Sequence, residues 1–209
     1  MKRHLIISSV IAGCFFMLSG PWALAQRPQE LFLFGDPLPN APELSLRGEY
    51  NVGVRTIEFV HKNQVDVLHS KDSVDPRYDR HLKAEVWYPA MLPEGATEFV
   101  VYDQVMGLSN NPKRPLIPFT FNGRALRNAP LLTTVSAFPL VIVSHGYPGS
   151  RLIFTYLTEN LASKGYVVVS IDHTESTFQD LAGFPSTLLN RSIDQLFVLE
   201  QIAELGKPS

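Results

Sequence analysis

The 209-residue sequence contains one cysteine, Cys14, and no block of basic residues. A single cysteine excludes an intramolecular disulfide framework. Lys and Arg total 18 against 20 Asp and Glu, giving a formal net charge of −2. Because no basic stretch stands out, composition indicates neither nucleic acid nor an anionic membrane surface as a partner. A nucleic-acid-binding function is therefore not expected.

Metal-binding spacing is also missing. The histidines outside the N-terminal segment form no H-x-x-x-H pattern, and no cysteine lies near them to complete a ligand set: His61, His69, His81, His145 and His173. Structural and catalytic metal sites normally show such pairings. We therefore expect neither a metal nor another cofactor.

The first 25 residues have the features of a bacterial secretory signal. Met1 to His4 is positively charged, residues 5–18 are mostly apolar, and Ala23-Leu24-Ala25 is a small-x-small cleavage site. The apolar run is shorter than the ~20 residues that span a bilayer, so a transmembrane anchor is not expected. We predict an exported protein, periplasmic or secreted. An alternative is a lipobox at Ile11 to Cys14, in which Cys14 would carry a lipid anchor.

The most informative stretch is FPLVIVSHGYPGSR, from Phe138 to Arg151. Leu140 to Val143 form an apolar run typical of a parallel strand that is buried on both faces. The next six residues, His145 to Ser150, include two glycines and a proline. Since ligands in α/β sheets bind outside the carboxyl ends of the strands, this turn is the expected place for chemistry.

This turn resembles the oxyanion loop of the α/β-hydrolase fold. Further segments, in the same order as in that family, are similar to bacterial dienelactone hydrolase-like esterases and to platelet-activating-factor acetylhydrolases: RTIEFV (55–60), EVWYPA (85–90), GRALRNAP (123–130), LASKGYVVVSIDH (161–173) and NRSIDQL (190–196). The resemblance implies an α/β fold with a mostly parallel central sheet flanked by helices. It also implies that the backbone N–H of Tyr147 binds the oxyanion. His145, Gly146, Pro148 and His173 are then expected to border the substrate, with His145 positioning the turn.

No G-x-S-x-G motif, the usual turn around the nucleophilic serine of this fold, occurs in the sequence. We therefore expect the chain to be the N-terminal half of an α/β hydrolase that stops before the nucleophile strand. The expected organisation is a signal peptide over 1–25, an extended proline-rich segment over 26–49 and a partial hydrolase domain over 50–209.

The patterns within 50–209 predict individual elements. Strands are expected over 51–60 and 82–88, the second with one half-exposed face carrying Lys83, Glu85 and Trp87, and a charged turn over 71–80 between them. The proline-rich residues 93–139 are expected to be mainly loop, in a position to cover an active-site mouth.

Two helices and a further strand complete the prediction. Ser150 is expected to cap a helix that Gly165 ends, and residues 166–171 to form the next buried strand. Asn190 is expected to cap a final helix that Gly206 ends.

A catalytic triad within the chain, drawn from Ser144, Ser170 or Ser176 with Asp172 and one of the two histidines His145 and His173, is disfavoured. Neighbouring residues on a strand point to opposite faces, so Ser144 cannot face His145, nor can Asp172 face His173.

The sequence thus predicts a serine esterase that acts on carboxylic esters, small-molecule or lipid, with this chain supplying the oxyanion loop and being inactive alone. Two alternatives are an inactive truncated fragment and a secreted module that binds a ligand on a hydrolase half-fold.

Overall fold

The computed structural model describes residues 33–36, 40–134 and 137–207. The predicted signal segment, Cys14 and the first part of the extended segment 26–49 lie outside these residues. The described part of that segment contains one short 3-10 helix, Glu43–Ser45.

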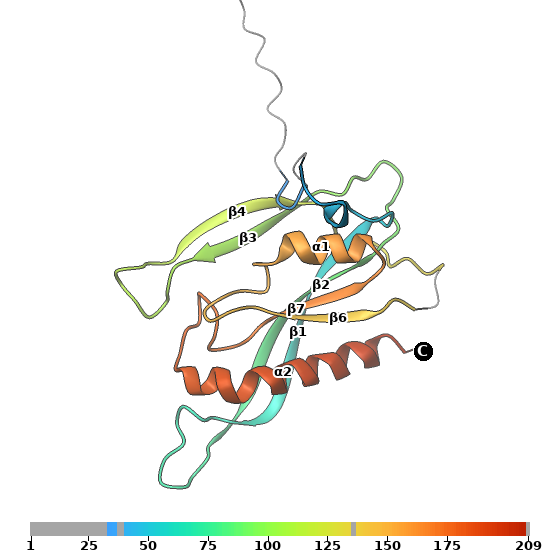
Figure 1. The fold of residues 1–209 in the computed structure, drawn as a ribbon. Helices are drawn as coiled ribbons and strands as arrows, with labels where there is room; N and C mark the ends of the chain where they lie inside the picture. The colour runs from blue at the N-terminus through green and yellow to red at the C-terminus, as the bar shows by residue number, and fades with distance from the viewer. Residues whose placement is uncertain (1–32, 37–39, 135–136, 208–209) are drawn as a thin grey trace, which may run out of the picture. The chain divides into compact units, whose positions relative to one another are not determined.

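A five-stranded mixed sheet forms the centre of the fold, in the order β5-β1-β2-β7-β6 (Figure 1). The long strands β1 (Val52–Val65) and β2 (Arg77–Pro89) are antiparallel. Strand β7 (Val167–Asp172) pairs antiparallel with β2 and parallel with β6 (Leu140–Ser144). The short strand β5 (Leu126–Arg127) runs parallel to β1. With helices beside this sheet, the α/β fold predicted from the sequence is confirmed.

The two long helices occupy opposite faces of the sheet (Figure 1). Helix α1 (Thr155–Ser163) follows the turn after β6, and Gly165, at φ +93°, ends it as predicted because a glycine adopts that angle without strain. The predicted cap at Ser150 is wrong, since residues 151–154 form turns and Phe154 precedes the helix. Helix α2 (Phe184–Leu205) ends at Gly206, also as predicted. Within the described residues, no helix combines the length and hydropathy needed to cross a membrane.

The predicted start of α2 at Asn190 is wrong. The helix begins at Phe184, with Gly183 before it and Pro185 in its first turn, where the missing N–H of proline costs nothing. Asn190 is buried inside the helix and donates from Nδ2 to Ser186 Oγ at 3.0 Å. The true start of the helix was not predicted because residues 181–185, with a glycine and a proline, have the composition of a loop.

Residues 93–139 are rich in loops, as predicted, but the prediction missed the strands that they contain. They contain an antiparallel hairpin of β3 (Val100–Met106) and β4 (Ile117–Gly123), in addition to β5. Pro112 and Pro115 fall in its turn, and Pro118 lies in a two-stranded element in which both strands are edges, where proline is tolerated. The prolines therefore mark the hairpin rather than exclude it.

The hairpin covers a sheet face that was expected to be half-exposed. Trp87 is buried against β3 and the residues around α1. Glu85 is buried as well, between the guanidinium groups of Arg127 and Arg151, whereas Lys83 is exposed. Leu82, Ala84 and Val86 point to the other face, toward α2. The charged turn predicted over 71–80 is also too long, since Arg77 to Arg80 already belong to β2.

A buried polar chain attaches the hairpin to helix α1. The Trp87 indole N–H donates to the Tyr102 hydroxyl at 2.8 Å, and that hydroxyl donates to Glu159 Oε1 at 2.7 Å. The backbone N–H of Arg124 donates to the other oxygen of Glu159 at 2.9 Å. Burial raises the pKa of Glu159 to about 7, although both of these donors favour the ionised form.

Strand β6 was expected to be buried on both faces, but all five of its residues are half-buried. It pairs with β7 along one side and has no strand on its other side among the described residues. The apolar run Leu140 to Val143 was correctly identified as a strand, and its exposure reflects its place at the edge of the described sheet.

Candidate active site

The turn from His145 to Ser150 lies at the carboxyl end of β6, beside the carboxyl end of β7. Parallel pairing places Ser144 opposite Ile171, so the residues that follow both strands meet at one edge of the sheet. The structure thereby brings His145 and His173 together, with ring centroids 5.3 Å apart. Tyr147 and Pro148, joined by a cis peptide bond, complete the predicted set with Gly146.

His145 is buried and both of its ring nitrogens have partners. Nδ1 lies 2.7 Å from the Gly146 carbonyl oxygen, and the His173 backbone N–H donates to Nε2 at 3.2 Å. These contacts assign the proton to Nδ1 of a neutral ring. Burial, helped by the nearby His173 and Arg191, lowers the pKa of His145 to about 4, so the ring is uncharged at neutral pH. His145 therefore links the two strand ends rather than carrying charge.

Gly149 is required by the closeness of the His145 ring. A Cβ at position 149 would lie 2.6 Å from Nδ1 of His145, which is closer than real Cβ contacts allow. At Gly146, by contrast, a Cβ would meet nothing within 4 Å. The two glycines of the turn thus have different roles, and only Gly149 is fixed by packing.

Arg191, on α2, holds the carbonyl groups of the turn. Its guanidinium donates to the carbonyl oxygen of His145 at 2.5 Å and to that of Gly146 at 3.1 Å. A third hydrogen bond goes to Ser176 Oγ at 2.6 Å. The loop after β7 adds two backbone hydrogen bonds, since Gly149 N–H donates to the Ser176 carbonyl and Phe178 N–H to the Gly149 carbonyl.

The side chain of Tyr147 is also held in place by protein contacts. The hydroxyl donates to the Ala182 carbonyl at 2.6 Å, and the ring packs edge-on against Phe184 at 5.0 Å. Within the described part of the chain, the N–H of Tyr147 donates to no protein acceptor. The turn therefore presents a backbone donor in a fixed position.

Ser144 and His173 are in contact, a pair that the argument against a triad within the chain did not consider. Ser144 Oγ lies 2.9 Å from Nε2 of His173, and Nδ1 of His173 lies 2.9 Å from Asp194 Oδ2. The two residues come from adjacent parallel strands, so the argument from neighbours on one strand does not apply to them. It does hold for Ser144 with His145 and for Asp172 with His173, which form no hydrogen bond within the described residues.

Arg80 competes with His173 for the carboxylate of Asp194, the last member of the hydrogen-bonded series Ser144, His173 and Asp194. Its guanidinium makes two hydrogen bonds to Asp194, at 2.8 and 3.0 Å, and both residues are buried. Burial alone would lower the pKa of Arg80, but the charge and hydrogen bonds of Asp194 raise it. The Asp194 charge is thus already neutralised by a permanent cation. In a Ser-His-Asp triad the carboxylate orients the histidine, whereas here Asp194 makes two of its hydrogen bonds to Arg80 and one to His173.

Sequence reasoning missed Arg80, Arg191 and Asp194. Arg80 was assigned to a turn, and Arg191 and Asp194 lay in the predicted final helix without a role. A signal was present, however, because Arg191 and Asp194 both lie in the segment NRSIDQL that contributed to the family resemblance.

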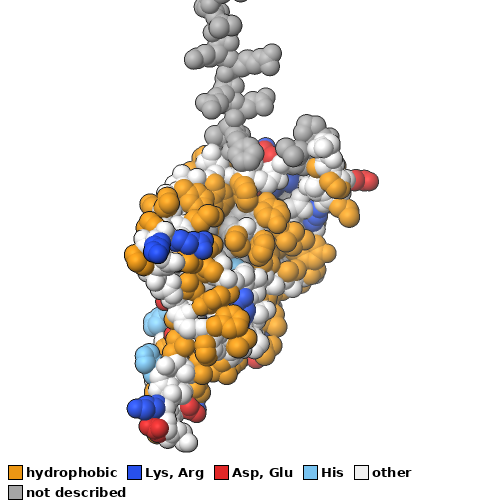
Figure 2. Space-filling view, turned by 60° about the vertical axis from the view of Figure 1, so that its left-hand side comes forward, with side chains coloured by type: hydrophobic (Ala, Val, Ile, Leu, Met, Phe, Trp, Pro, Cys, Tyr) orange, Lys and Arg blue, Asp and Glu red, His pale blue; other side chains and the backbone are white. Residues whose placement is uncertain are grey.

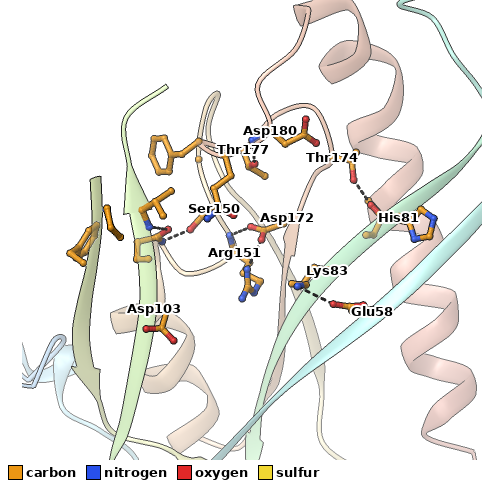
Figure 3. Close-up of a pocket in the computed structure, with 18 of the residues that line it drawn as sticks. Glu58, His81, Lys83, Asp103, Ser150, Arg151, Asp172, Thr174, Thr177 and Asp180 are labelled. Carbon is orange, nitrogen blue, oxygen red and sulfur yellow. Dashed lines mark hydrogen bonds and ion pairs between the residues drawn. The ribbon is translucent and has the colours of Figure 1, made fainter. Parts of the chain in front are cut away.

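A cavity of about 750 Å³ lies behind the turn, between the β3–β4 hairpin and strands β1 and β2 (Figure 3). Ser150 and Arg151 line it, and Ser150 Oγ accepts a hydrogen bond from Gln104 of the hairpin at 2.5 Å. Arg151 bridges Asp172 at 2.5 Å and Glu85 at 3.0 Å. His145 to Pro148 do not line the cavity. It therefore borders the far end of the turn, away from the Tyr147 N–H.

No group of three or more potential ligands for a metal ion occurs within residues 33–36, 40–134 and 137–207.

Comparison with known families identifies the chain. The model of the family described as platelet-activating factor acetylhydrolase, isoform II, matches residues 42–180, which include every strand of the central sheet and the turn after β6. The chain belongs to this family. Its membership agrees with the resemblance seen in the sequence.

A ferulic acid esterase from Streptomyces cinnamoneus has a similar fold, with a TM-score of 0.50 and 22% sequence identity. The match covers 79% of this chain and 49% of the esterase, so the chain spans about half the length of that structure. At this level of identity the likeness concerns the fold.

Proposed function

We propose that this chain takes part in the hydrolysis of carboxylic esters, with the turn after β6 stabilising the oxyanion of the tetrahedral intermediate. The observation that carries the proposal is the backbone N–H of Tyr147, which is fixed in place yet has no acceptor among the described residues. Membership of the acetylhydrolase family supports the same reaction class.

The chemistry needs a donor placed where negative charge develops. When a nucleophile attacks the ester carbonyl, its oxygen becomes an oxyanion, and an N–H fixed beforehand stabilises it without reorganisation. Losing one such donor typically costs about 2.7–4 kcal/mol of transition-state stabilisation. Arg191 and His145 hold the turn that carries Tyr147, so both are positioning residues in this proposal.

The nucleophile and its base come from outside the 209 residues in this proposal. The sequence has no G-x-S-x-G, and both ring nitrogens of His145 are engaged with backbone groups. Ser144 is the alternative nucleophile, because it contacts His173. The ion pair of Asp194 with Arg80 argues against it.

Substrates of the proposed enzyme are carboxylic esters of small molecules or lipids, including acetyl and longer acyl esters. We further propose export to the periplasm or beyond, which the signal-like residues 1–25 support. N-terminal sequencing of the protein recovered from a bacterial periplasm tests this, and Gln26 is the expected first residue.

The activity is tested by comparing the product of the complete reading frame with the 209-residue chain on p-nitrophenyl butyrate. We expect hydrolysis that a serine-directed inhibitor blocks in the first, and only background in the second. Hydrolysis by the 209-residue chain that Ser144→Ala abolishes would instead place the nucleophile in this chain. No hydrolysis by either protein would favour the ligand-binding alternative.

A further inference from the structure

The end of the β3–β4 hairpin, residues Met106–Phe119, carries an exposed apolar cluster. We refer to this segment as the hairpin tip. Met106 and Ile117 stand opposite each other in the strand register and are 55% and 63% exposed. Leu116, beside Ile117, is exposed as well, and so is Phe119, two residues farther along β4, which also borders the cavity described above. Single exposed apolar residues are common on proteins, but a contiguous group on one small element marks an interaction surface.

The charged side chains of the hairpin tip are both basic. Lys113 and Arg114 lie in its turn, are exposed and form no salt bridge within the described residues. The sequence contains no Asp or Glu between Asp103 and Glu159. Exposed apolar side chains together with basic ones are the composition that binds the interface of an anionic bilayer.

The hairpin tip is held beside the candidate active site. Ser109 N–H donates to the Phe178 carbonyl at 3.1 Å, and Leu181 N–H donates to Ser109 Oγ at 3.0 Å. Phe178 in turn bonds to Gly149 of the turn after β6. In Figure 1 the tip and the N-terminal end of α2 both lie at the left-hand end of the sheet. Figure 2, which brings that side forward, shows hydrophobic side chains gathered over much of the face, with basic side chains among them.

We propose that the hairpin tip binds the surface of a bilayer that contains anionic phospholipids, with Met106, Leu116, Ile117 and Phe119 entering the interface and Lys113 and Arg114 contacting the headgroups. Whole-chain composition did not indicate such a surface, because the two basic residues are few and the net charge is negative. The fold concentrates them next to the apolar cluster. This inference goes beyond the proposed esterase activity, and binding is measured without any substrate.

Co-sedimentation of the full chain with vesicles tests the proposal. Wild type is expected to bind vesicles of phosphatidylcholine and phosphatidylglycerol more tightly than vesicles of phosphatidylcholine alone. The double variant Met106→Asp/Ile117→Asp should weaken binding at least tenfold. Leu44→Asp, at an exposed leucine outside the hairpin tip, is the matched control and should bind like wild type. All these proteins share residues 1–32, so their differences report on the described part of the chain.

Charge is tested separately. Lys113→Glu/Arg114→Glu should weaken binding to the mixed vesicles by at least fivefold per residue, since each basic residue near such a surface contributes about 1 kcal/mol. Lys62→Glu, at an exposed lysine of β1, should leave the affinity nearly unchanged. Equal losses in Lys62→Glu and the double variant would overturn the specific role of the hairpin tip.

A local probe identifies which surface meets the lipid. In a Cys14→Ser background, an environment-sensitive fluorophore on Ile117→Cys should shift its emission to the blue when vesicles are added, whereas one on Leu44→Cys should not. No shift at position 117 would overturn the proposal. So would a wild-type dimer that Met106→Asp/Ile117→Asp converts to a monomer with vesicle binding unchanged, because a second copy of the chain would then cover this surface.

Discussion

The backbone N–H of His173 donates to Nε2 of His145 across 3.2 Å, so the residues that follow β6 and β7 are joined through one neutral imidazole. This hydrogen bond needs an unprotonated Nε2, and burial keeps the pKa of the ring at about 4. Protonation of His145 would remove the acceptor and place a cation beside Arg191. The hydrogen bond that joins the turn to the residue after β7 therefore depends on pH.

The first prediction concerns how the free energy of unfolding depends on pH. The pKa of His145 falls from 6.5 to about 4 on folding, so between these values the unfolded chain binds a proton that the folded chain does not. The free energy of unfolding then rises with pH. The pKa of Glu159 rises from 4.5 to about 7, so there the folded chain holds the extra proton and the free energy of unfolding falls as pH rises. Each effect is worth about 3 kcal/mol, and the two oppose each other between pH 4.5 and 6.5.

Urea unfolding of the purified chain at several pH values separates the two effects. Relative to wild type, Glu159→Gln should gain stability with rising pH, because only the His145 effect is left. His145→Asn should lose stability over the same range. Variant curves parallel to the wild-type curve would show that these groups do not titrate with the stated pKa values.

The second prediction concerns the two glycines of the turn. Gly149→Ala would place a Cβ against the buried ring of His145 and should cost about 1–3 kcal/mol, as overpacking does. Gly146→Ala meets open space and should change the free energy of unfolding by no more than about 0.5 kcal/mol. Thermal unfolding of both variants checks the contrast, and equal losses would mean that the turn is not packed as described.

The third prediction separates the buried ion pair from the Ser144 contact. Asp194→Asn leaves the buried Arg80 guanidinium without its main counter-charge and should destabilise the chain by about 3 kcal/mol or more. Ser144→Ala removes one hydrogen bond to His173 and should cost about 1 kcal/mol. Chemical denaturation gives both values. A larger loss for Ser144→Ala than for Asp194→Asn would contradict the assignment of Asp194 to Arg80.

The fourth prediction tests the oxyanion donor in the catalytically active product of the complete reading frame. Tyr147→Pro removes the backbone N–H and should lower kcat by about 10²–10³. Tyr147→Phe keeps the N–H and loses only the hydroxyl bond to Ala182, so its kcat should fall much less. Circular dichroism confirms that both variants are folded. Similar kcat values in the two would remove Tyr147 from the mechanism.

Local patterns predicted the parts of the fold that they determine. The apolar run at Leu140 to Val143 gave a strand, the spacing of apolar residues after Ser150 gave a helix, and Gly165 marked its end. The hairpin β3–β4 was missed because its strands have mixed polarity and several prolines, which suit an edge ribbon as well as a loop.

The candidate site was also predicted only in part, where the determining residues are close together in the sequence. The turn after β6 was predicted from its own residues, since glycine and proline act locally. Asp194 contacts Arg80 directly and Ser144 through His173. These residues come from elements that are far apart in the sequence, and no local pattern encodes their contact. The burial of Trp87 depends on the hairpin that was missed, and the burial of Glu85 depends on Arg127 and Arg151, which are far from it in the sequence.

The hydrogen-bond chain from Trp87 through Tyr102 to Glu159 gives the protein an optical reporter. The environment of the Trp87 indole depends on a hydroxyl whose only side-chain acceptor among the described residues is a carboxyl that titrates near neutral pH. Trp22, the other tryptophan, lies outside the described residues. We therefore expect the intrinsic emission of Trp87, measured in a Trp22→Phe background, to follow the proton on Glu159 and the attachment of the hairpin to α1 in unlabelled protein.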